Sequence, residues 1–199
     1  MRLRHPVMLV GTIALGLLSS FAWDEAFAED PRAGGAAARG LASQVTAAVE
    51  QIYPQVEALY MDLHRNPELS GQERETAARF ARELRSNGFQ VTTGVGGVGV
   101  VALLRNGTGP TVMLRAELDG LPVEEKTGLP YASRAKARDH GELVPVMHAC
   151  GHDVQMAGVV GAARILARMK DRWRGTLMGR VQLRWRRRPR FVLRRSCRL

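Results

Sequence analysis

The sequence predicts an α/β layered domain that follows a secretory signal peptide. Three observations lead to this prediction: apolar residues first recur at helical spacing, the pattern then changes to short β-branched runs, and helical spacing returns near residue 154. The chain has 199 residues, about the size of one domain, and its 45% hydrophobic and 24% charged content is that of an ordinary globular protein.

The first 28 residues have the features of a signal peptide. Arg2, Arg4 and His5 precede the apolar run PVMLVGTIALGLLSSFAW, and Ala-Phe-Ala at 26–28 supplies a small-x-small cleavage site. We expect cleavage after Ala28 and a secreted or periplasmic protein without a stable membrane anchor. An uncleaved anchor is the alternative, which the short apolar run disfavours. Residues 29–40, rich in Gly and Ala, are expected to form a disordered linker.

Helical periodicity frames the expected sheet on both sides. NPELSGQE (66–73) ends the first helix, and Ser70 or Gly71 is expected to cap a second helix that runs to about Asn87, where Asn-Gly supplies a stop. A third helix is expected over residues 154–169. The first helix, over residues 41–64, is defined by apolar residues at helical spacing: Val45, Val49, Ile52, Val56, Leu59, Tyr60 and Leu63.

Strands are expected where short runs are rich in β-branched residues, at 89–95, 99–107 and 111–118. RNGTGP (105–110) between the last two predicts a hairpin turn. Residues 119–145 predict a long loop, and loops of such length are usually functional or disordered. WRGTLMG (173–179) is expected to begin a further strand.

Positive charge is concentrated at the C-terminus. The net charge is +10, but residues 180–199 contain nine arginines and no acid, so the rest of the chain has 20 Lys and Arg against 19 Asp and Glu. One alternative function is therefore a non-enzymatic basic protein that binds nucleic acid or an anionic membrane through this tail, with Trp185 and Phe191 stacking on bases. A frameshift in GC-rich DNA also produces arginine runs, so no nucleic-acid partner is expected. An inert, misfolded fragment is a third hypothesis.

The segment PVMHACGHD (145–153) concentrates residues that bind metals. Two histidines, a cysteine and an aspartate fall within six residues, although the chain has only five His and two Cys. A thiolate and a neutral imidazole are good ligands for zinc and similar ions, and Cys150 and His152 are separated only by Gly151, which permits a tight backbone conformation. The dipole of the following helix favours the thiolate.

Several alternatives remain open for this segment. His148 could be a ligand, a supporting group or a substrate contact. The motif could also be a buried cysteine with histidines that hydrogen-bond to the backbone. In an oxidising compartment, Cys150 could instead form a disulfide with Cys197.

Three segments in order resemble one enzyme family: LHRNPELSGQE (63–73), TVMLRAELDGLPVEEKTGLPYAS (111–133) and VPVMHACGHDVQM (144–156). Together they resemble the metal-dependent aminoacylase/carboxypeptidase family of amidohydrolases, in the branch of hippurate hydrolases and indole-acetyl-amino-acid hydrolases. The resemblance implies the N-terminal part of a di-metal aminopeptidase-like catalytic domain over residues 41–178, a mixed sheet flanked by helices, without the lid domain. It also implies two divalent ions (zinc, manganese, cobalt or nickel), an N-acyl amino acid or peptide-like substrate, and is compatible with a homo-oligomer.

The resemblance assigns roles position by position. Cys150 looks like the thiolate ligand that bridges the metals, and His152 like a ligand of one of them. Asp119 matches an aspartate that orients a ligand, although a turn residue before Gly120 is the alternative. Glu117 stands where aspartate is usual, and Gln155 stands where many relatives have a histidine.

The family pattern stops after Met178. The resemblance implies a general-base glutamate and a ligand glutamate near positions 185 and 186, where this chain has Trp185 and Arg186. We therefore expect no catalytic base and no activity from the chain as written. Tryptophan has the single codon TGG. If Arg186 and Arg187 have the codons AGG and AGR, the DNA from Trp185 onward is TGG-AGG-AGR, and reading it two bases later gives GAG-GAG, which encodes Glu-Glu. This register suggests that residues 179–199 are an out-of-frame tail.

Overall fold

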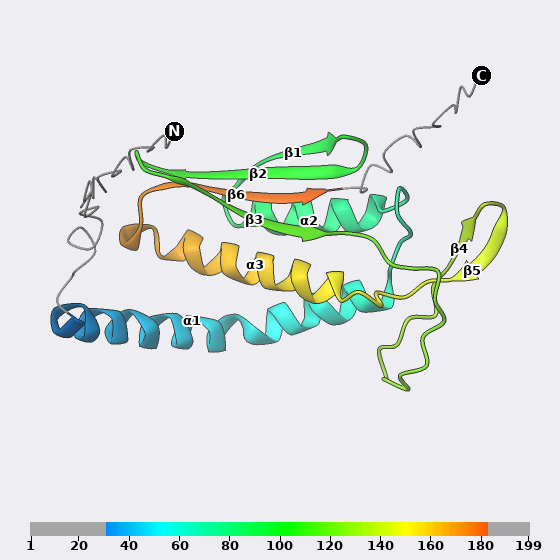
Figure 1. Ribbon diagram of the computed structural model, residues 1–199, viewed down its shortest axis with the longest axis horizontal. Helices are drawn as coiled ribbons and strands as arrows, with labels where there is room; N and C mark the ends of the chain where they lie inside the picture. The colour runs from blue at the N-terminus through cyan, green and yellow to red at the C-terminus, as the bar shows by residue number, and fades with distance from the viewer. Residues whose placement is uncertain (1–30, 183–199) are drawn as a thin grey trace, which may run out of the picture. The chain divides into compact units, whose positions relative to one another are not determined.

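The computed structural model describes residues 31–182 (Figure 1). Residues 1–30 and 183–199 lie outside the described residues, and with them the predicted signal peptide, Cys197 and most of the arginine-rich tail. The chain divides into two units, residues 1–42 and 43–199. Of the first unit, the described part is residues 31–42, which form the beginning of helix α1 (Pro31–Arg65).

Helix α1 begins at Pro31 rather than at Leu41, so the expected disordered linker is wrong for residues 31–40. Proline is favoured in the first turn of a helix, where its missing N–H costs nothing, and the Ala and Arg residues that follow are strong helix formers. Glycine content alone was a misleading sign of disorder. Among the described residues, no helix has both the length and the apolar character needed to cross a membrane.

A four-stranded mixed sheet forms the centre of the second unit, with strand order β1-β2-β6-β3. Strand β6 lies between β2 and β3, antiparallel to β2 and parallel to β3. The expected hairpin between β2 and β3 is therefore wrong, because the two strands follow each other in the chain but do not pair. The strands are β1 (Gln90–Val95), β2 (Gly99–Asn106), β3 (Thr111–Glu117) and β6 (Gly175–Gln182).

The extent of strand β6 places the end of the folded domain later than Met178, the end expected from the sequence. Val181 pairs with Val100 of β2 and with Ala116 of β3, and it is buried. Residues 179–182 are thus part of the sheet, and the arginine-rich segment that follows begins after Gln182.

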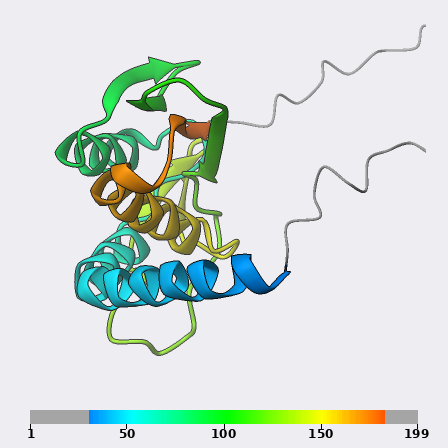
Figure 2. The same cartoon turned by 90° about the vertical axis from the view of Figure 1, so that its left-hand side faces the viewer.

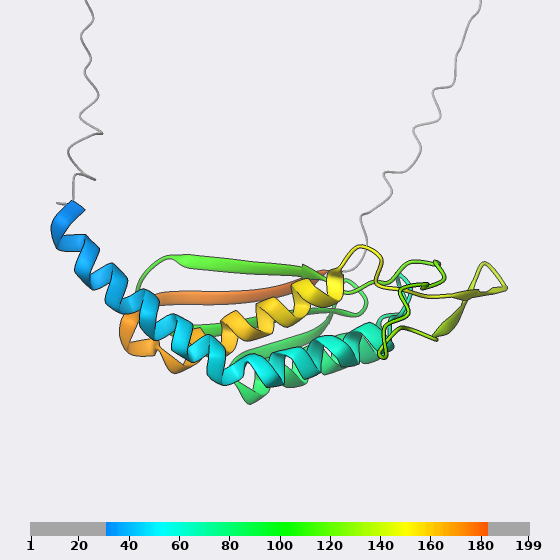
Figure 3. The same ribbon diagram turned by 90° about the horizontal axis from the view of Figure 1, so that it is seen from below.

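Helices α2 (Arg74–Ser86) and α3 (His152–Arg168) cover one face of the sheet (Figures 1 and 2). The part of α1 after residue 43 packs against α3 from the side away from the sheet, as Figure 3 shows from below. A Cβ at Gly161 would lie 3.4 Å from Val56, so the two helices approach closely there. A short 3₁₀ helix, η1 (Lys170–Arg172), leads from α3 to β6.

The core confirms the helical and strand patterns of the sequence. It lies between the sheet and the two covering helices, and its buried residues come from α1, α2, α3 and strands β2, β3 and β6. They include Leu59, Leu63, Ala77, Phe80, Ala81, Leu84, Val100, Ala102, Leu104, Ala116, Met156, Val160, Ala163, Leu177 and Val181.

Helix α2 is capped differently from the expectation. It begins at Arg74, after Glu73, and neither Ser70 nor Gly71 caps it. Instead the carboxylate of Glu68 accepts hydrogen bonds from the backbone N–H of Thr76 at 2.8 Å and from its hydroxyl at 2.7 Å. A carboxylate suits this position because the first N–H groups of a helix are unpaired and carry partial positive charge.

The long loop after β3 contains a small hairpin that the sequence analysis missed. Strands β4 (Lys136–Asp139) and β5 (Glu142–Pro145) pair antiparallel around His140 and Gly141. Both turn residues have positive φ, 48° and 93°, as a tight two-residue hairpin turn requires. The irregular part of the loop is therefore limited to residues 118–135.

Candidate metal centre

Three side chains with metal-binding chemistry meet where β3 ends and α3 begins. Glu117 is the last residue of β3, Asp119 follows it, and His152 is the first residue of α3. One ligand atom from each lies within 4.8 Å of the others. In open α/β sheets, ligands bind outside the carboxyl ends of the strands, and this group occupies that position.

The ring of His152 faces acceptors on both sides. Its Nδ1 lies 3.0 Å from Oδ1 of Asp119 and 2.9 Å from the Asp119 carbonyl oxygen, and its Nε2 lies 3.0 Å from Oε2 of Glu117. A neutral imidazole has only one N–H, so it can donate to Asp119 or to Glu117 but not to both. With Nδ1–H donated to Asp119, Nε2 is left as a lone pair beside a carboxylate. A cation between them would satisfy both groups.

Two glycines give the backbone the shape that this group needs. A Cβ at Gly120 would come within 2.9 Å of Pro67 and of Val146, so only glycine lets the segment after Asp119 pass between these residues. Gly151 has φ +71° at the N-cap of α3, in the left-handed region where glycine is favoured. The sequence analysis assigned Gly151 this conformational role, and the structure agrees.

Cys150 is not part of the group of three. It is exposed, and it is the single cysteine among the described residues, so a disulfide with Cys197 cannot be traced within them. The structure thus brings together His152 and Asp119 of the predicted site, and adds Glu117, which the sequence analysis had noted only as a departure from aspartate. The assignment of Cys150 as a ligand stays a prediction.

His148 is buried and has no hydrogen-bond partner on either ring nitrogen among the described residues. Burial lowers the pKa of His148, and the nearby Asp153 carboxylate and Asp119 backbone oppose this effect only in part. A buried polar group without partners is rare in proteins and points to a missing ligand or water. The three roles open to His148, as a ligand, a supporting group or a substrate contact, therefore remain predictions.

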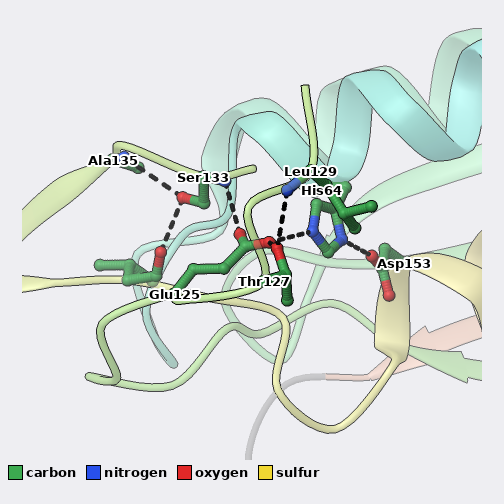
Figure 4. A network of polar contacts seen from close by, with 8 residues as sticks. His64, Glu125, Thr127, Leu129, Ser133, Ala135 and Asp153 are labelled. Carbon is green, nitrogen blue, oxygen red and sulfur yellow. Dashed lines mark hydrogen bonds and ion pairs between the residues drawn. The ribbon is translucent and has the colours of Figure 1, made fainter. Parts of the chain in front are cut away.

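A second histidine, which the sequence analysis did not single out, also lies between two carboxylates. Nδ1 of His64 is 2.6 Å from Oδ2 of Asp153, and its Nε2 is 3.0 Å from Oε1 of Glu125 (Figure 4). His64 comes from the last turn of α1, Asp153 from the first turn of α3, and Glu125 from the loop after β3. The sequence offered one sign of this residue: His64 lies in the segment LHRNPE, directly after Leu63, which is buried.

The electrostatics of this second cluster follow from its burial and its hydrogen bonds. Burial by itself would lower the pKa of His64, but the hydrogen bonds to Glu125 and Asp153 outweigh it and raise the pKa. Burial likewise works to raise the pKa of Glu125, while Thr127, His64 and the Ser133 N–H together lower it. Both shifts favour an imidazolium beside carboxylates.

Comparison with known proteins relates the sequence around this site to a protein family. The model of peptidase family M20/M25/M40 matches residues 113–181, which include most of β3, the three-residue group and most of β6. N-acetyl-L-cysteine deacetylase of Bacillus subtilis is 42% identical over 122 residues, which are 61% of this chain and 26% of that protein. Hippurate hydrolase of Campylobacter jejuni is 38% identical over 112 residues, or 56% of this chain and 27% of that one.

Solved structures agree with the sequence matches. The YXEP protein of Bacillus subtilis, described as a dinuclear metal-binding peptidase of the M20 family, superposes with a TM-score of 0.59 at 32% identity. The superposition covers 67% of this chain and 36% of that structure. The chain thus spans about a quarter of the length of the curated relatives named above. The resemblance found in the sequence is confirmed: residues 113–181 match the model of peptidase family M20/M25/M40, and the fold is similar to that of an M20 peptidase.

Proposed function

We propose that this chain is part of a metal-dependent hydrolase that cleaves the amide bond of N-acyl amino acids or similar peptide-like molecules. The observation that carries the proposal is the group of Glu117, Asp119 and His152 at the carboxyl end of β3. Relatives whose names state an N-acyl amino acid substrate, the deacetylase and the hippurate hydrolase, support the substrate class.

The residues of the group fit a divalent cation in their donor chemistry. Asp119 accepts the Nδ1–H of His152, which fixes the ring and leaves Nε2 directed at Glu117. This arrangement, a carboxylate behind a histidine, is the usual way in which proteins orient a histidine ligand and raise its basicity. Arg115 holds the other oxygen of Glu117 at 2.6 Å, which steadies that carboxylate. A bound divalent cation would supply a water activated for attack at neutral pH.

The reaction is hydrolysis. The oxygen of water adds to the amide carbonyl carbon, the C–N bond breaks, and the departing nitrogen takes a proton, so that a carboxylic acid and an amino acid leave. The family resemblance assigns the proton transfer to a glutamate at a position that Trp185 occupies in this chain. We therefore propose that the chain as written binds metal but hydrolyses nothing above background.

Metal binding tests the first half of the proposal. Titration of the purified chain with Zn²⁺ or Mn²⁺ should show saturable binding, and His152→Ala should abolish most of it. Cys150→Ser should weaken it, since a hydroxyl is a poorer anionic ligand than a thiolate. His140→Asn is the matched control, because His140 is an exposed histidine in the β4–β5 turn and asparagine tolerates positive φ. Equal loss in His140→Asn and His152→Ala would refute the assignment.

The coding DNA tests the second half. Restoring the frame after the codon for Gln182 should place a Glu-Glu pair near positions 185–186 and should yield metal-dependent release of amino acid from an N-acyl substrate such as hippurate. CGN codons at Arg186 and Arg187 would remove the frameshift hypothesis. Metal-dependent hydrolysis by the 199-residue chain would show that the missing glutamates are dispensable.

Export is proposed on the sequence pattern of residues 1–28, which lie outside the described residues. N-terminal sequencing of protein recovered from the secreted or periplasmic fraction should begin at Glu29. A mature chain that still starts at Met1 would contradict cleavage after Ala28.

A further inference from the structure

We propose that His64 is a positioning residue for the candidate metal centre: its ring joins Glu125 to Asp153 and so ties the loop of residues 121–135 to the first turn of α3, the turn that carries His152. The inference rests on the proposed function, because the metal centre is what His64 would position. No hydrogen bond or ion pair among the described residues joins His64 to Glu117, Asp119 or His152, so it would act through its two carboxylate partners.

The geometry and the burial of the cluster favour a cation at His64. Both ring nitrogens face carboxylate oxygens, at 2.6 and 3.0 Å, and an N–H on each nitrogen lets both contacts form as hydrogen bonds. The three side chains are nearly inaccessible, with 7% of His64, 2% of Asp153 and none of Glu125 exposed. Without the imidazolium, two carboxylates would be left buried close together, which is a costly arrangement.

Glu125 connects two parts of the loop of residues 121–135 to the ring of His64. Its Oε1 accepts the Thr127 hydroxyl, and its Oε2 accepts the backbone N–H of Ser133, each at 2.5 Å (Figure 4). Ser133 in turn donates its hydroxyl to the carbonyl of Val146, just before the segment of His148 and Cys150. Both limbs of the loop are therefore attached to one carboxylate, and that carboxylate is attached to His64.

Asp153 transmits the position of His64 to the metal centre. It is buried in the first turn of α3, where its Oδ1 also accepts the backbone N–H of Val154 at 2.9 Å. The neighbouring residue His152, in the same turn, contacts Asp119 and Glu117. The first turn of α3 is thus held on one hand by the contact of Asp153 with His64 and on the other by the contacts of His152 with Asp119 and Glu117. Loss of the contact with His64 should therefore loosen the ring of His152.

Two variants distinguish an electrostatic role of His64 from a role in packing, because they differ in the net charge of the cluster. His64→Gln keeps much of the volume but leaves Glu125 and Asp153 facing each other without a cation. Adding Glu125→Gln removes one of these charges and leaves a net charge of −1, as in the native cluster. If the role is electrostatic, the double variant should behave better than the single one, whereas loss of packing alone would make it worse.

The experiment uses the full 199-residue chain and follows amide hydrogen exchange together with Zn²⁺ affinity. We expect His64→Gln to speed exchange in residues 121–135 and 150–158 and to weaken Zn²⁺ binding by about 10-fold, the lower end of what loss of a supporting contact costs. His64→Gln/Glu125→Gln should recover part of both, and His140→Asn should change neither. Faster exchange with unchanged Zn²⁺ affinity, or no recovery in the double variant, would overturn the proposal.

Failure of the proposed function would look different. If the native chain binds no Zn²⁺, the function is wrong, and exchange alone then tests the tie between the loop and α3. If His64→Gln does not fold, Glu125→Gln replaces it. That variant should loosen residues 121–135 and leave 150–158 protected, because His64 keeps Asp153. Equal loosening of both segments, or of neither, would refute the tie.

Discussion

Two clusters of the same composition meet at neighbouring residues of α3 and differ in their environment. Each consists of one histidine between an aspartate and a glutamate, and Asp153 of one follows directly after His152 of the other. In the His64 cluster the carboxylates are almost fully buried, whereas in the His152 cluster Glu117 and Asp119 are 30% and 26% exposed.

This difference in burial indicates which cluster can accept a ligand. Glu125 is saturated by Thr127, Ser133 and His64, so the His64 cluster is complete as it stands. In the His152 cluster, the two carboxylates that face the ring are partly accessible to solvent. The closed cluster therefore suits a structural and positioning role, and the open one suits a cation that enters from solvent.

The largest expected effect separates the clusters by stability. His64→Ala should lower the free energy of unfolding by about 3–5 kcal/mol, because it strands two buried carboxylates. His152→Ala should change it by no more than about 1 kcal/mol, since its partners can be hydrated. Urea denaturation of both variants measures the difference. Similar losses for both would mean that the two clusters are not distinct in this way.

The next effect concerns metal affinity. Asp119→Asn should weaken Zn²⁺ binding by about 10–100-fold, because asparagine can accept the hydrogen bond from His152 but lacks the charge that raises its basicity. Isothermal titration at fixed pH measures the change. Glu124→Gln is the control, since Glu124 is an exposed carboxylate paired only with Lys126 among the described contacts. An equal effect of the control would indicate nonspecific attraction of the cation.

A third prediction disturbs the open cluster through its backbone. Gly120→Ala should cost about 1–3 kcal/mol of stability, because its Cβ would press on Pro67 and Val146 and shift the adjacent Asp119. Gly158→Ala in α3 is the contrasting variant, because nothing lies within 4 Å of its Cβ and alanine favours helix. Thermal melts should shift in opposite directions. A neutral Gly120→Ala would show that the segment can move aside.

Local patterns predicted most of the elements, because helix and strand periodicity reside in neighbouring residues. The apolar faces of α2 and α3 and strands β1, β2, β3 and β6 were all expected from the sequence. The pairing was not: β2 and β3 are adjacent in the chain and joined by a turn-like segment, but β6, more than 60 residues later, lies between them. Strand order depends on long-range contacts that a local pattern does not contain.

The site was predictable to a similar degree. His152 and Asp119 are 33 residues apart, and the resemblance to a family, not any local pattern, brought them together beforehand. The contacts of His64 span 61 and 89 residues, and nothing in the spacing of Glu125 or Asp153 indicates them. Gly120 was expected only as a turn, and its need for glycine becomes evident from the close approach of Pro67 and Val146.

The smallest expected effect is a pH dependence that belongs to the closed cluster alone. The pKa of His64 is raised in the folded chain above the ordinary value of about 6.5, so its contribution to stability is complete below that pH and is lost as the pH rises through the folded pKa. Besides Glu125 and Asp153, the rings of Tyr60 and Tyr131 face His64. Burial and Tyr131 raise the pKa of Tyr60 to about 12, so its phenol stays neutral over this range.

The difference in unfolding free energy between the native chain and His64→Gln measures this contribution, since titrating groups away from the cluster cancel. The difference should be largest below about pH 6.5 and should narrow as the pH rises and the native histidine loses its proton. A gap that stays constant or widens as the pH rises would mean that His64 is not held as a cation between its carboxylates.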